Sequence, residues 1–485
     1  MIPIVEYPSV VTAALPAFDH VFTKPQKNNF CKYLTGLTLS PVHTISSMNS
    51  MFVGHSDSSA FNNFITDSTW SDEELEKARY DFALNGLNTS EVTREGGECI
   101  MILDDTLAHK TGDHMEFAGN FYDDTDETFT LAHDIVSSNL VKGRASIPLD
   151  FQIYLKKDQL NSKYLASISR IDDPKEEAAH IDQILSEERY KRKNEIAREL
   201  TTKAFERGIP FSCVVADSIF LCPETVDLIE SLNKKISWVF ASKGDRLVQT
   251  PSGWISLSEW AKTIPDGKFK KVRVRYARKR RVFWAYARNM RMSSLGGRKV
   301  RVLVSYNNPE LKGKPRFFCT NKLDWVEYKI LKVYARRWKI DAFYRDSKQN
   351  LGLEDYEMRK IKGVRRHLQM VFIAHTLLEL GSGGTTAASS KLDNAIKVAA
   401  DDSRKQTAAL LPNNQKRDTI GFKCRMVYTE VLTSFINLVL QIAAELNYDA
   451  RKIADIALSS KTALRRKLGK GGKVVAVALP LLGLE

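Results

Sequence analysis

The chain has 485 residues, of which 43% are hydrophobic and 27% are charged; this is the composition of a globular protein and excludes wholesale disorder. Lys and Arg number 72 against 58 Asp and Glu, so the formal net charge is +14. A basic excess of this size favours a polyanionic partner over an acidic small molecule.

The excess charge is concentrated in one segment. Between Lys268 and Arg301 there are 14 basic residues and no acid, and the rest of the chain holds 58 basic and 58 acidic residues. Fourteen cations without an acid would repel one another unless a polyanion were present. The sequence therefore predicts a nucleic-acid contact in this segment.

The cysteines and the termini indicate a cytoplasmic protein. The six cysteines form no C-x-x-C pair, so neither a disulfide framework nor a thiolate zinc site is indicated, and we expect reduced thiols. The N-terminus lacks a basic segment followed by an apolar run, and the apolar run near the C-terminus is interrupted by Pro480. We expect no signal peptide and no membrane span.

The first half of the chain changes from helical to strand patterns near residue 98. Residues 1–95 are typical of short helices and loops, and Ser71 followed by acids predicts a helix N-terminus. The apolar run Ile100 to Leu103 predicts a buried strand that leads into Asp104-Asp105-Thr106. Two further strands are expected at Thr128 to Val136 and at Pro148 to Leu155.

The following elements complete an α/β pattern. A helix is expected from Lys175 to Arg207, between Pro174 and Gly208. Strands at Phe211 to Asp217 and at Ile236 to Ala241 enclose a short helix that Pro223 opens. Three strands, a helix, a strand, a helix and a strand is the order of a ribonuclease-H-like fold.

The second half is predicted to be a basic β-rich insertion followed by helices. A long helix from Leu323 to Leu351 ends at Gly352, and an apolar helix follows from Val364 to Leu380. A flexible linker begins at Gly381, and further helices are expected between about 391 and 465. The fold class is therefore α/β: a ribonuclease-H-like core with a basic β-rich insertion between helical terminal domains. The predicted segments are a helical DNA-binding region (1–95), the core (96–243 and 323–362), the insertion (244–322) and a helical C-terminal region (363–485).

Carboxylates follow two of the predicted strands and lie on the long helix. Asp104 and Asp105 close the first strand, Asp217 closes the fourth, and Asp341 is on the helix. Hard divalent cations such as Mg²⁺ prefer oxygen ligands of this kind. Taken singly, an aspartate at a strand end is more often a turn former or a helix cap than a metal ligand.

The long helix carries a distinctive row of side chains. At 100° per residue, Tyr334, Arg337, Asp341 and Lys348 share one narrow face, and the opposite face is mainly apolar. The row has two interpretations. It is either the solvated face of an amphipathic helix or a site for a metal ion and the sugar-phosphate backbone beside it.

These residues resemble a known family. The spacing Tyr334-x-x-Arg337-x-x-x-Asp341-x-x-x-x-x-x-Lys348 is similar to the Y-(2)-R-(3)-E-(6)-K motif of bacterial cut-and-paste insertion-sequence transposases of the DDE superfamily. The surrounding YARRWKIDAFYRDSKQNLGLE resembles that family closely, ILDDTLAHKTG resembles its first acidic block, and VVADS resembles its second. The resemblance covers about residues 98–355.

The resemblance leaves two acids to be assigned. The third acid of the family is usually Glu, and here Asp341 matches it, with Asp346 and Glu354 as nearby alternatives. Family blocks of the form acid-Asp-Thr favour Asp105 as the first acid, and Asp104 is its alternative.

The resemblance implies a DNA transposase that binds terminal inverted repeats and catalyses metal-dependent strand cleavage and strand transfer. Asp105, Asp217 and Asp341 would hold two Mg²⁺ or Mn²⁺ ions, one activating a water or a 3′-hydroxyl and the other stabilising the leaving oxygen. Tyr334, Arg337 and Lys348 would contact phosphates of the transposon end. The implied partners are double-stranded DNA at the inverted repeats and at the target, and further copies of the chain in a dimer or larger synaptic complex at the nucleoid.

In the family, an insertion before the last helix grips the DNA end, and residues 244–322 occupy that place. Aromatic side chains interleave with its cations, and they would either stack on unpaired bases or form the core face of a β-ribbon. Besides the helix residues, the predicted DNA contacts are Arg278, Lys279, Arg280, Arg281, Trp284, Arg288, Arg291, Arg298 and Lys299.

Two other functions compete with a transposase. One is a domesticated DNA-binding protein that has lost its chemistry, and the intact acids argue against it. The other is a ribonuclease-H-like nuclease without strand transfer, and the four-residue helix motif argues against that.

Overall fold

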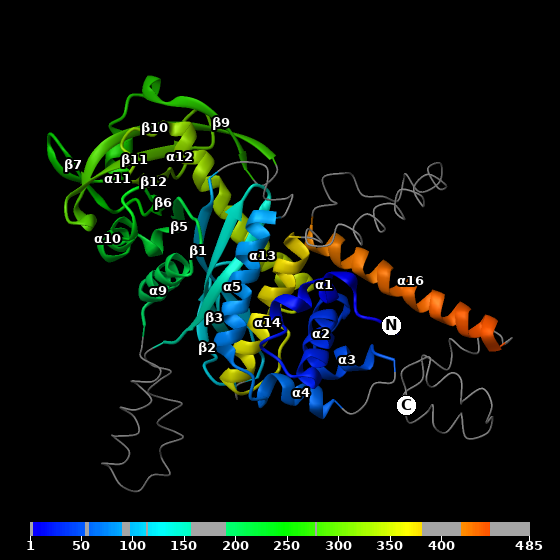
Figure 1. Ribbon diagram of the computed structural model, residues 1–485. Coiled ribbons are helices and arrows are strands. Elements are labelled where there is room, and N and C mark those ends of the chain that lie inside the picture. The colour runs from blue at the N-terminus through cyan, green and yellow to red at the C-terminus, as the bar shows by residue number, and fades with distance from the viewer. Residues whose placement is uncertain are drawn as a thin grey trace, which may run out of the picture. The chain divides into compact units, whose positions relative to one another are not determined.

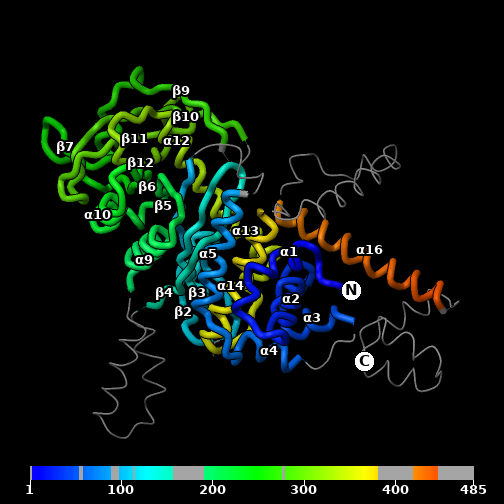
Figure 2. The backbone as a smooth tube through the Cα atoms, in the orientation of Figure 1, coloured from blue at the N-terminus to red at the C-terminus, as the bar shows by residue number. Residues whose placement is uncertain are grey.

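A computed structural model describes residues 3–53, 58–89, 98–112, 115–156, 191–276, 279–380 and 419–446. The chain divides into two compact units (Figures 1 and 2). The sheet unit comprises Val92–Asp113 and Phe117–Phe343, and the helical unit comprises Met1–Glu91, His114–Glu116 and Tyr344–Glu485.

The sheet unit is built on one mixed sheet of 12 strands. Its order is β2-β3-β1-β5-β6-β12-β11-β10-β7-β8, with β4 paired to β3 and β9 paired to β10. The strands are β1 (Ile100–His109), β2 (Gly119–Asp123), β3 (Thr128–Lys142), β4 (Ala145–Tyr154), β5 (Cys213–Ala216), β6 (Ser237–Ser242), β7 (Leu247–Thr250), β8 (Gly253–Ser256), β9 (Lys270–Tyr276), β10 (Lys279–Met292), β11 (Arg298–Tyr306) and β12 (Arg316–Thr320).

The five strands β4-β3-β1-β5-β6 form the predicted ribonuclease-H-like core. β3 runs antiparallel to β1 and β4, whereas β1, β5 and β6 are parallel. Parallel neighbours need crossover connections, which α9 (Lys193–Glu206) and α10 (Pro223–Leu232) provide. The part of the predicted Lys175–Arg207 helix before residue 191 lies outside the described residues. All five predicted strands are confirmed.

Strand β2 was not predicted from the sequence. Its five residues, GNFYD, include glycine, asparagine and aspartate, which are depleted in strands. It forms because it pairs with the first residues of β3, a tertiary contact that local propensity does not contain.

The insertion is β-rich, as predicted, and it continues the core sheet. β12 pairs antiparallel with β6, and β11 and β10 follow in order. One short helix, α11 (Leu257–Lys262), and two 3-10 turns, η2 (Asp266–Lys268) and η3 (Ser293–Leu295), interrupt the strands. The basic segment therefore rests on the same hydrogen-bonded sheet as the core strands.

The long helix predicted from Leu323 to Leu351 is divided in two. The structure has α12 (Glu327–Tyr334), a 3-10 turn η4 (Ala335–Arg337) and α13 (Trp338–Asn350). A 3-10 turn has three residues per turn, so faces counted at 100° per residue do not continue across it. The predicted apolar side of α13 is confirmed, because Ile340, Phe343 and Ser347 are all buried.

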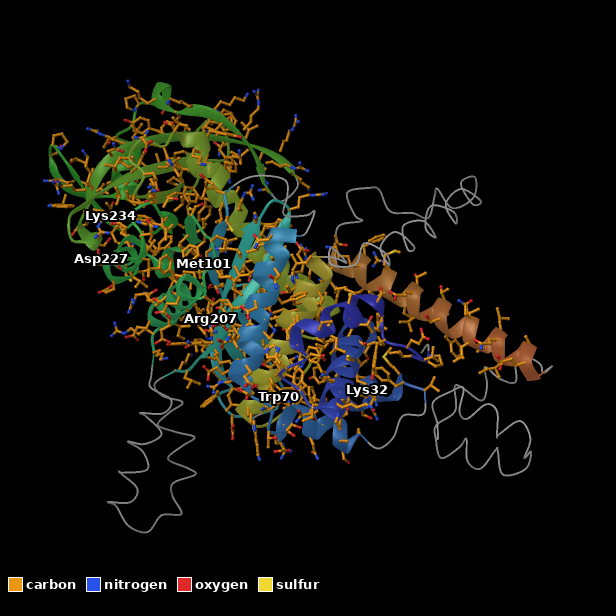
Figure 3. All side chains as sticks on the ribbon, viewed as in Figure 1. Lys32, Trp70, Met101, Arg207, Asp227 and Lys234 are labelled. Carbon is orange, nitrogen blue, oxygen red and sulfur yellow. The ribbon has the colours of Figure 1, made fainter. Side chains whose placement is uncertain are left out.

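The helical unit surrounds the buried helix α14. Helix α14 spans Ile361–Leu380, and the other helices that the structure describes in this unit are α1 (Ser9–Phe18), α2 (Lys24–Leu39), α3 (Ile45–Ser50), α4 (Ser59–Thr66), α5 (Asp72–Thr89) and α16 (Ile420–Leu446). The predicted N-cap is confirmed, since Ser71 Oγ accepts a hydrogen bond from Glu74 N at 3.1 Å. Arg366 of α14 lies 3.6 Å from the ring centroid of Trp70 (labelled in Figure 3) and donates to Asp72 and to three backbone carbonyls.

Helix α16 is amphipathic. Among the described helices, its residues Ile420–Glu445 are long and apolar enough to cross a membrane, a criterion that soluble core helices also meet. Val431 on one side packs with Ile4, Met51 and Phe52. Glu430 accepts hydrogen bonds from the backbone and hydroxyl groups of Ser9.

Gly352 ends α13 in a left-handed conformation with φ +64°, and a Cβ there would lie 2.5 Å from the imidazole of His43. Gly208 follows α9 with φ +75° and has open space around the same position. We expect Gly208→Ala to lower the free energy of unfolding by about 1–2 kcal/mol, the backbone cost alone. Gly352→Ala should cost roughly 1–3 kcal/mol more because it also overpacks the core.

Urea unfolding of the two variants measures this difference. Equal losses would mean that the helical unit accommodates the methyl group without strain.

Candidate active site

Strand pairing brings the first two acidic positions together. In the parallel pair β1–β5, Leu103 is opposite Ala216, so Asp104 of β1 lies beside Asp217, the residue that follows β5. The prediction that Asp104 and Asp105 close the first strand was wrong, because β1 continues to His109. The carboxyl ends of neighbouring parallel strands meet at one edge of a sheet, and paired residues face the same side. Asp104 therefore lies in register with Asp217.

Asp105 points to the other face of β1, because successive side chains of a strand alternate. Its Oδ2 accepts a hydrogen bond from Nζ of Lys193, the first residue of α9, at 2.7 Å. The same Nζ lies 2.6 Å from Asp134 on β3, whose side chain is 1% exposed. Asp105 thus belongs to an ion-paired cluster that joins α9 to the sheet.

The third acidic position, Asp341, meets Asp104 through Arg337. The guanidinium of Arg337 donates to Asp104 through Nη1, and it donates to both carboxylate oxygens of Asp341 at 3.1 and 3.3 Å. Arg337 is the last residue of the η4 turn and Asp341 lies in the first turn of α13. The 3-10 turn is therefore the local feature that presents this guanidinium to both acids.

The carboxylates repel one another. Burial raises the pKa of Asp104 to about 8; Arg337 opposes the shift, and the negative charges of Asp105, Asp341 and Asp217 add to it. Burial also raises the pKa of Asp341, with Arg337 opposing and Asp217 adding. The acids raise the pKa of Arg337 although its burial acts the other way. Three separate segments of the chain thus form one electrostatic group.

The cluster on the opposite face of β1 behaves similarly. Burial raises the pKa of Asp134 to about 7 against the attraction of Lys193, and the charge of Asp105 adds to the rise. The pKa of Lys193 is raised because the attraction of Asp134 and Asp105 outweighs its burial. The two adjacent aspartates of β1 therefore have different cations as partners.

Asp104, Asp217 and Asp341, which we call the acid group, do not form a metal site in this arrangement. Oxygen donors suit a divalent cation, but among the described residues no three His, Cys, Asp or Glu side chains are grouped as ligands for one ion. Arg337 supplies the positive charge between Asp104 and Asp341 instead. Asp217 accepts from the backbone N of Ser218 at 2.6 Å.

The other residues of the helix motif have contacts of their own. The ring of Tyr334 packs against Phe318 on β12, with centroids 4.4 Å apart. Lys348 forms an ion pair with Glu354 at 3.1 Å, and Asp346 pairs with Arg345 at 2.8 Å. The two alternatives to Asp341, Asp346 and Glu354, are therefore each held by a neighbouring cation.

The basic insertion presents a cationic face on the β9–β10 hairpin. Lys271, Arg273 and Arg275 are exposed, whereas the alternating Val272 and Val274 are buried. Antiparallel pairing sets Arg275 opposite Arg280, Arg273 opposite Val282 and Lys271 opposite Trp284. We call Lys271, Arg273, Arg275, Arg280 and Trp284 the cationic face. Side chains with nitrogen at their tips project around this part of the sheet unit in Figure 3.

Not every cation of the segment is available to a polyanion. Arg298 pairs with Asp227 and Glu230 on α10, and Lys270 pairs with Glu327 on α12. Arg291 donates to the carbonyl of Gly297 at 3.0 Å. Other predicted contacts, Lys279, Arg280, Arg281, Arg288 and Lys299, are exposed, and Arg278 lies outside the described residues.

Some aromatic residues of the basic segment pack inside the protein, as a core face would, and others are placed where they could stack on a base. Phe269 packs on Tyr286 and Tyr306, and Tyr286 packs on Trp260, so these rings form an internal cluster. Trp284 is half-buried, and the ammonium of Lys271 lies 5.8 Å from its ring centroid. Trp284 thus shares a face with exposed cations.

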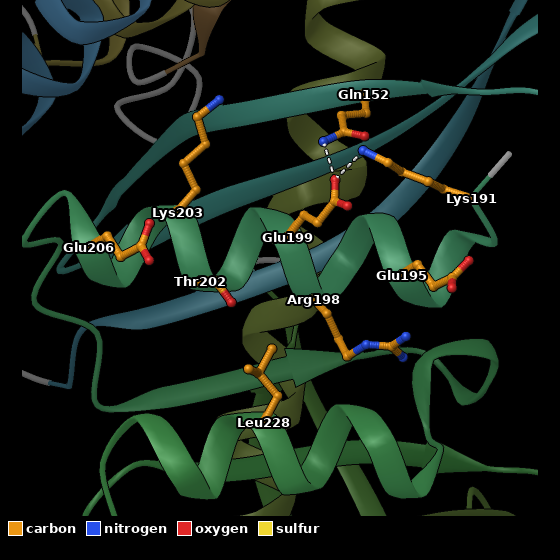
Figure 4. A pocket seen from close by; sticks show the side chains of 9 residues that line it. All are labelled: Gln152, Lys191, Glu195, Arg198, Glu199, Thr202, Lys203, Glu206 and Leu228. Atoms are coloured by element: carbon orange, nitrogen blue, oxygen red, sulfur yellow. Dashed lines mark hydrogen bonds and ion pairs between the residues drawn. The ribbon is translucent and has the colours of Figure 1, made fainter. Parts of the chain in front are cut away.

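A groove of about 540 Å³ lies between α9, β4 and α10 (Figure 4). Glu199 at its centre accepts hydrogen bonds from Gln152 and Lys191. None of Asp104, Asp217 and Asp341 lines it. The groove is therefore separate from the acid group.

Sequence reasoning missed Lys193, Asp134 and the part that Arg337 plays between two acids. Lys193 stands at a helix start with no motif around it, and Asp134 lies within a strand. A signal for Asp104 was present, because the runs Ile100–Leu103 and Cys213–Ala216 have equal length and end directly before Asp104 and Asp217.

Comparison with known proteins gives a family match over part of the chain. Residues 17–253 match the family described as DDE superfamily endonuclease, a range that includes Asp104 and Asp217 and ends before Asp341. No curated protein sequence matches the chain. Among solved structures, the chain is similar to a piggyBac transposase in a cryo-EM synaptic complex with hairpin DNA, with a TM-score of 0.42 and 10% identity over 96% of this chain and 82% of that one. Enzymes of the DDE superfamily generally use divalent metal ions. The chain is thus similar over residues 17–253 to the family of DDE superfamily endonucleases.

Proposed function

We propose that the chain is a cut-and-paste DNA transposase whose catalytic carboxylates are Asp104, Asp217 and Asp341. The observation that carries the proposal is the convergence of these acids, from β1, from the end of β5 and from α13, around Arg337. A carboxylate whose pKa is raised by burial and by neighbouring charges, as that of Asp104 is, is characteristic of functional sites. Within a DDE superfamily endonuclease domain, they are the natural candidates for phosphodiester chemistry.

Asp104 takes the place that the family pattern gives to Asp105. Asp104 shares a face of the sheet with Asp217 and a guanidinium with Asp341, whereas Asp105 bonds to Lys193 on the opposite face. In this proposal, Asp105 positions β1 by anchoring it to α9 and does not touch the substrate.

The proposed cofactor is Mg²⁺ or Mn²⁺, with two ions in each active site. Asp104, Asp217 and Asp341 would hold these ions, which would supply positive charge at the attacking and the leaving oxygen. The proposed substrate is double-stranded DNA at the terminal inverted repeats of a bacterial insertion sequence, with strand transfer into target DNA by a dimer or larger assembly in the cytoplasm, at the nucleoid.

Two sets of residues would hold that DNA. The cationic face would follow the phosphates, with Trp284 available to stack on an unpaired base. Tyr334, Arg337 and Lys348 would contact phosphates of the transposon end. A planar guanidinium pairs with two phosphate oxygens at once, which favours Arg337 for the contact nearest the reacting bond.

We expect Asp104→Asn, Asp217→Asn and Asp341→Asn each to lower DNA cleavage by roughly 10²- to 10³-fold or more, the scale for removing a group that stabilises transition-state charge. The assay uses Mg²⁺ and plasmid DNA carrying the sequences that flank the coding region, and it measures nicking, excision and joining. Asp346→Asn is the matched control and should cleave like the wild type, because its partner is Arg345.

The same assay separates the competing functions. A wild type that binds the flanking DNA and never cuts it would be a binding protein, and one that cuts without joining would be a nuclease. Loss of cleavage in Asp346→Asn but not in Asp341→Asn would mean that Asp346, and not Asp341, is the third catalytic carboxylate.

The pH dependence of stability tests the environment of Asp104. Folding raises its pKa from 3.8 to about 8, so between these values the folded chain keeps a proton that the unfolded chain has lost. The free energy of unfolding must therefore fall as the pH rises through this window, by up to about 1.4 kcal/mol per pH unit. We expect Asp104→Asn to lack this decline, so that its stability relative to the wild type increases from pH 5 to pH 8.

Chemical unfolding of both proteins at several pH values measures the effect. A stability difference that stays constant across this range would show that the carboxyl of Asp104 titrates alike in the folded and unfolded chains.

The salt dependence of DNA binding tests the cationic face. Each phosphate contact that is lost reduces the slope of log K against log [salt] by about 1. We expect Arg275→Gln and Arg280→Gln each to reduce the slope by about this amount. Arg298→Gln is the matched control with the same charge change, and it should leave the slope nearly unchanged because Asp227 and Glu230 already neutralise that guanidinium.

Fluorescence anisotropy with a duplex of the flanking sequence, titrated at several salt concentrations, gives the slopes. Equal slopes for Arg280→Gln and the wild type would mean that the β9–β10 hairpin does not contact the DNA.

A further inference from the structure

The carboxylate of Asp217 is oriented by the turn that follows it. This turn is η1 (Ser218–Phe220), a 3-10 turn of three residues, and Asp217 caps it by accepting a hydrogen bond from the backbone N of Ser218 at 2.6 Å. A turn this short satisfies few of its own backbone groups. Whatever holds η1 therefore also decides where the carboxylate of Asp217 points.

Arg246, in the loop between β6 and β7, holds both ends of η1. Its Nη2 donates to the carbonyl of Leu221, the residue that caps the end of the turn, at 2.7 Å. The same nitrogen donates to the carbonyl of Ser218, at the beginning of the turn, at 3.4 Å. Basic side chains that bind carbonyls at the end of a helical turn stabilise it. One guanidinium nitrogen thus spans the turn that Asp217 caps.

Arg246 is itself held by the basic insertion. Its Nη1 donates to Oγ of Ser294 in η3 at 3.0 Å, and its carbonyl accepts a hydrogen bond from the backbone N of Leu257 in α11 at 2.9 Å. The neighbouring Gly244 packs closely on the same helix, since a Cβ there would lie 2.3 Å from Oγ of Ser258. Two elements of the insertion therefore fix the loop that carries Arg246.

We propose that Arg246 is a positioning residue for Asp217: by tying η1 to the insertion, it fixes the direction in which that carboxylate points. This inference rests on the proposed function and goes beyond it, because it gives the insertion a part in the chemistry in addition to DNA binding. A displacement of about 1 Å at a functional group can cost roughly 100-fold in rate, so a residue that acts only through η1 still affects cleavage.

Hydrogen exchange of the full chain, followed by mass spectrometry on a peptide that contains η1, gives the first test. The amides of Ser218, Phe220 and Leu221 are hydrogen-bonded within the turn and its cap. Arg246→Met removes the guanidinium donors and keeps an apolar stem. We expect the amides of η1 to exchange about tenfold faster in this variant, because their local opening costs less free energy.

Lys322→Met is the matched control for exchange. It removes another cation of the sheet unit that donates to a backbone carbonyl, in this case that of Lys235 at 3.4 Å. The loop that contains Lys235 precedes β6 and is separate from η1. Exchange in η1 should therefore stay at the wild-type rate in this variant.

The rate of DNA cleavage gives the second test. At saturating DNA, Arg246→Met should cut roughly 10- to 100-fold more slowly than the wild type. Its affinity for a duplex of the flanking sequence, measured by fluorescence anisotropy, should stay close to that of the wild type, which separates positioning of the acid from binding of the substrate. Arg246→Lys keeps the charge on one donor nitrogen, and we expect it to lie between the two proteins in both exchange and rate.

The outcomes separate this inference from the function on which it rests. Wild-type exchange of η1 in Arg246→Met overturns the inference, and so does faster exchange with an unchanged cleavage rate. If urea unfolding shows that Arg246→Met does not fold, Arg246→Lys decides: faster exchange with slower cleavage supports the inference, and wild-type exchange overturns it. A wild type that never cuts DNA would contradict the proposed function instead, and exchange alone would then decide whether Arg246 holds the turn.

Discussion

Repulsion between a buried carboxylate, that of Asp104, and two half-buried ones is the constraint around which the acids of the sheet unit are arranged. Asp104, Asp217 and Asp341 come from a strand, a strand end and a helix; Asp217 and Asp341 add to the cost of ionising Asp104, and Asp217 adds to that of Asp341. A group of this kind persists only when a cation offsets it, and Arg337 does so here. The parallel pairing of β1 with β5 and the 3-10 turn before α13 are the two features that bring the charges together.

The alternation of side chains along β1 gives two adjacent aspartates different surroundings. Asp104 faces the acid group and Arg337, while Asp105 faces Lys193, which also pairs with the buried Asp134. Removing one partner of a buried ion pair is costly because it leaves an unpaired charge. Lys193 therefore fixes both the start of α9 and the orientation of β1. A substitution at Asp105 would shift β1 and with it the neighbouring side chain of Asp104.

The sequence predicted the core strands because each is a continuous apolar run bounded by turn residues, as in Ile100–Leu103 and Cys213–Ala216. The family pattern favoured Asp105 over Asp104 as the first acid, but which of the two shares a face with Asp217 depends on the register between strands more than 100 residues apart. The single long helix was wrong for a related reason: the contacts of Arg337 that accompany the η4 turn are tertiary. Likewise, the acids that neutralise Arg298 come from α10, far from the basic segment in sequence.

The β9–β10 hairpin contains a pair of like charges that repel each other. Arg275 and Arg280 are cross-strand partners, and like charges directly opposite each other weaken a strand pair. Added salt screens that repulsion, so the free hairpin should hold its pairing better as ionic strength rises. The same ions compete for the phosphates of DNA. A rise in ionic strength thus stabilises the pairing of this hairpin and weakens its affinity for a polyanion. A bound polyanion would offset the repulsion between the two arginines, as salt does for the free hairpin.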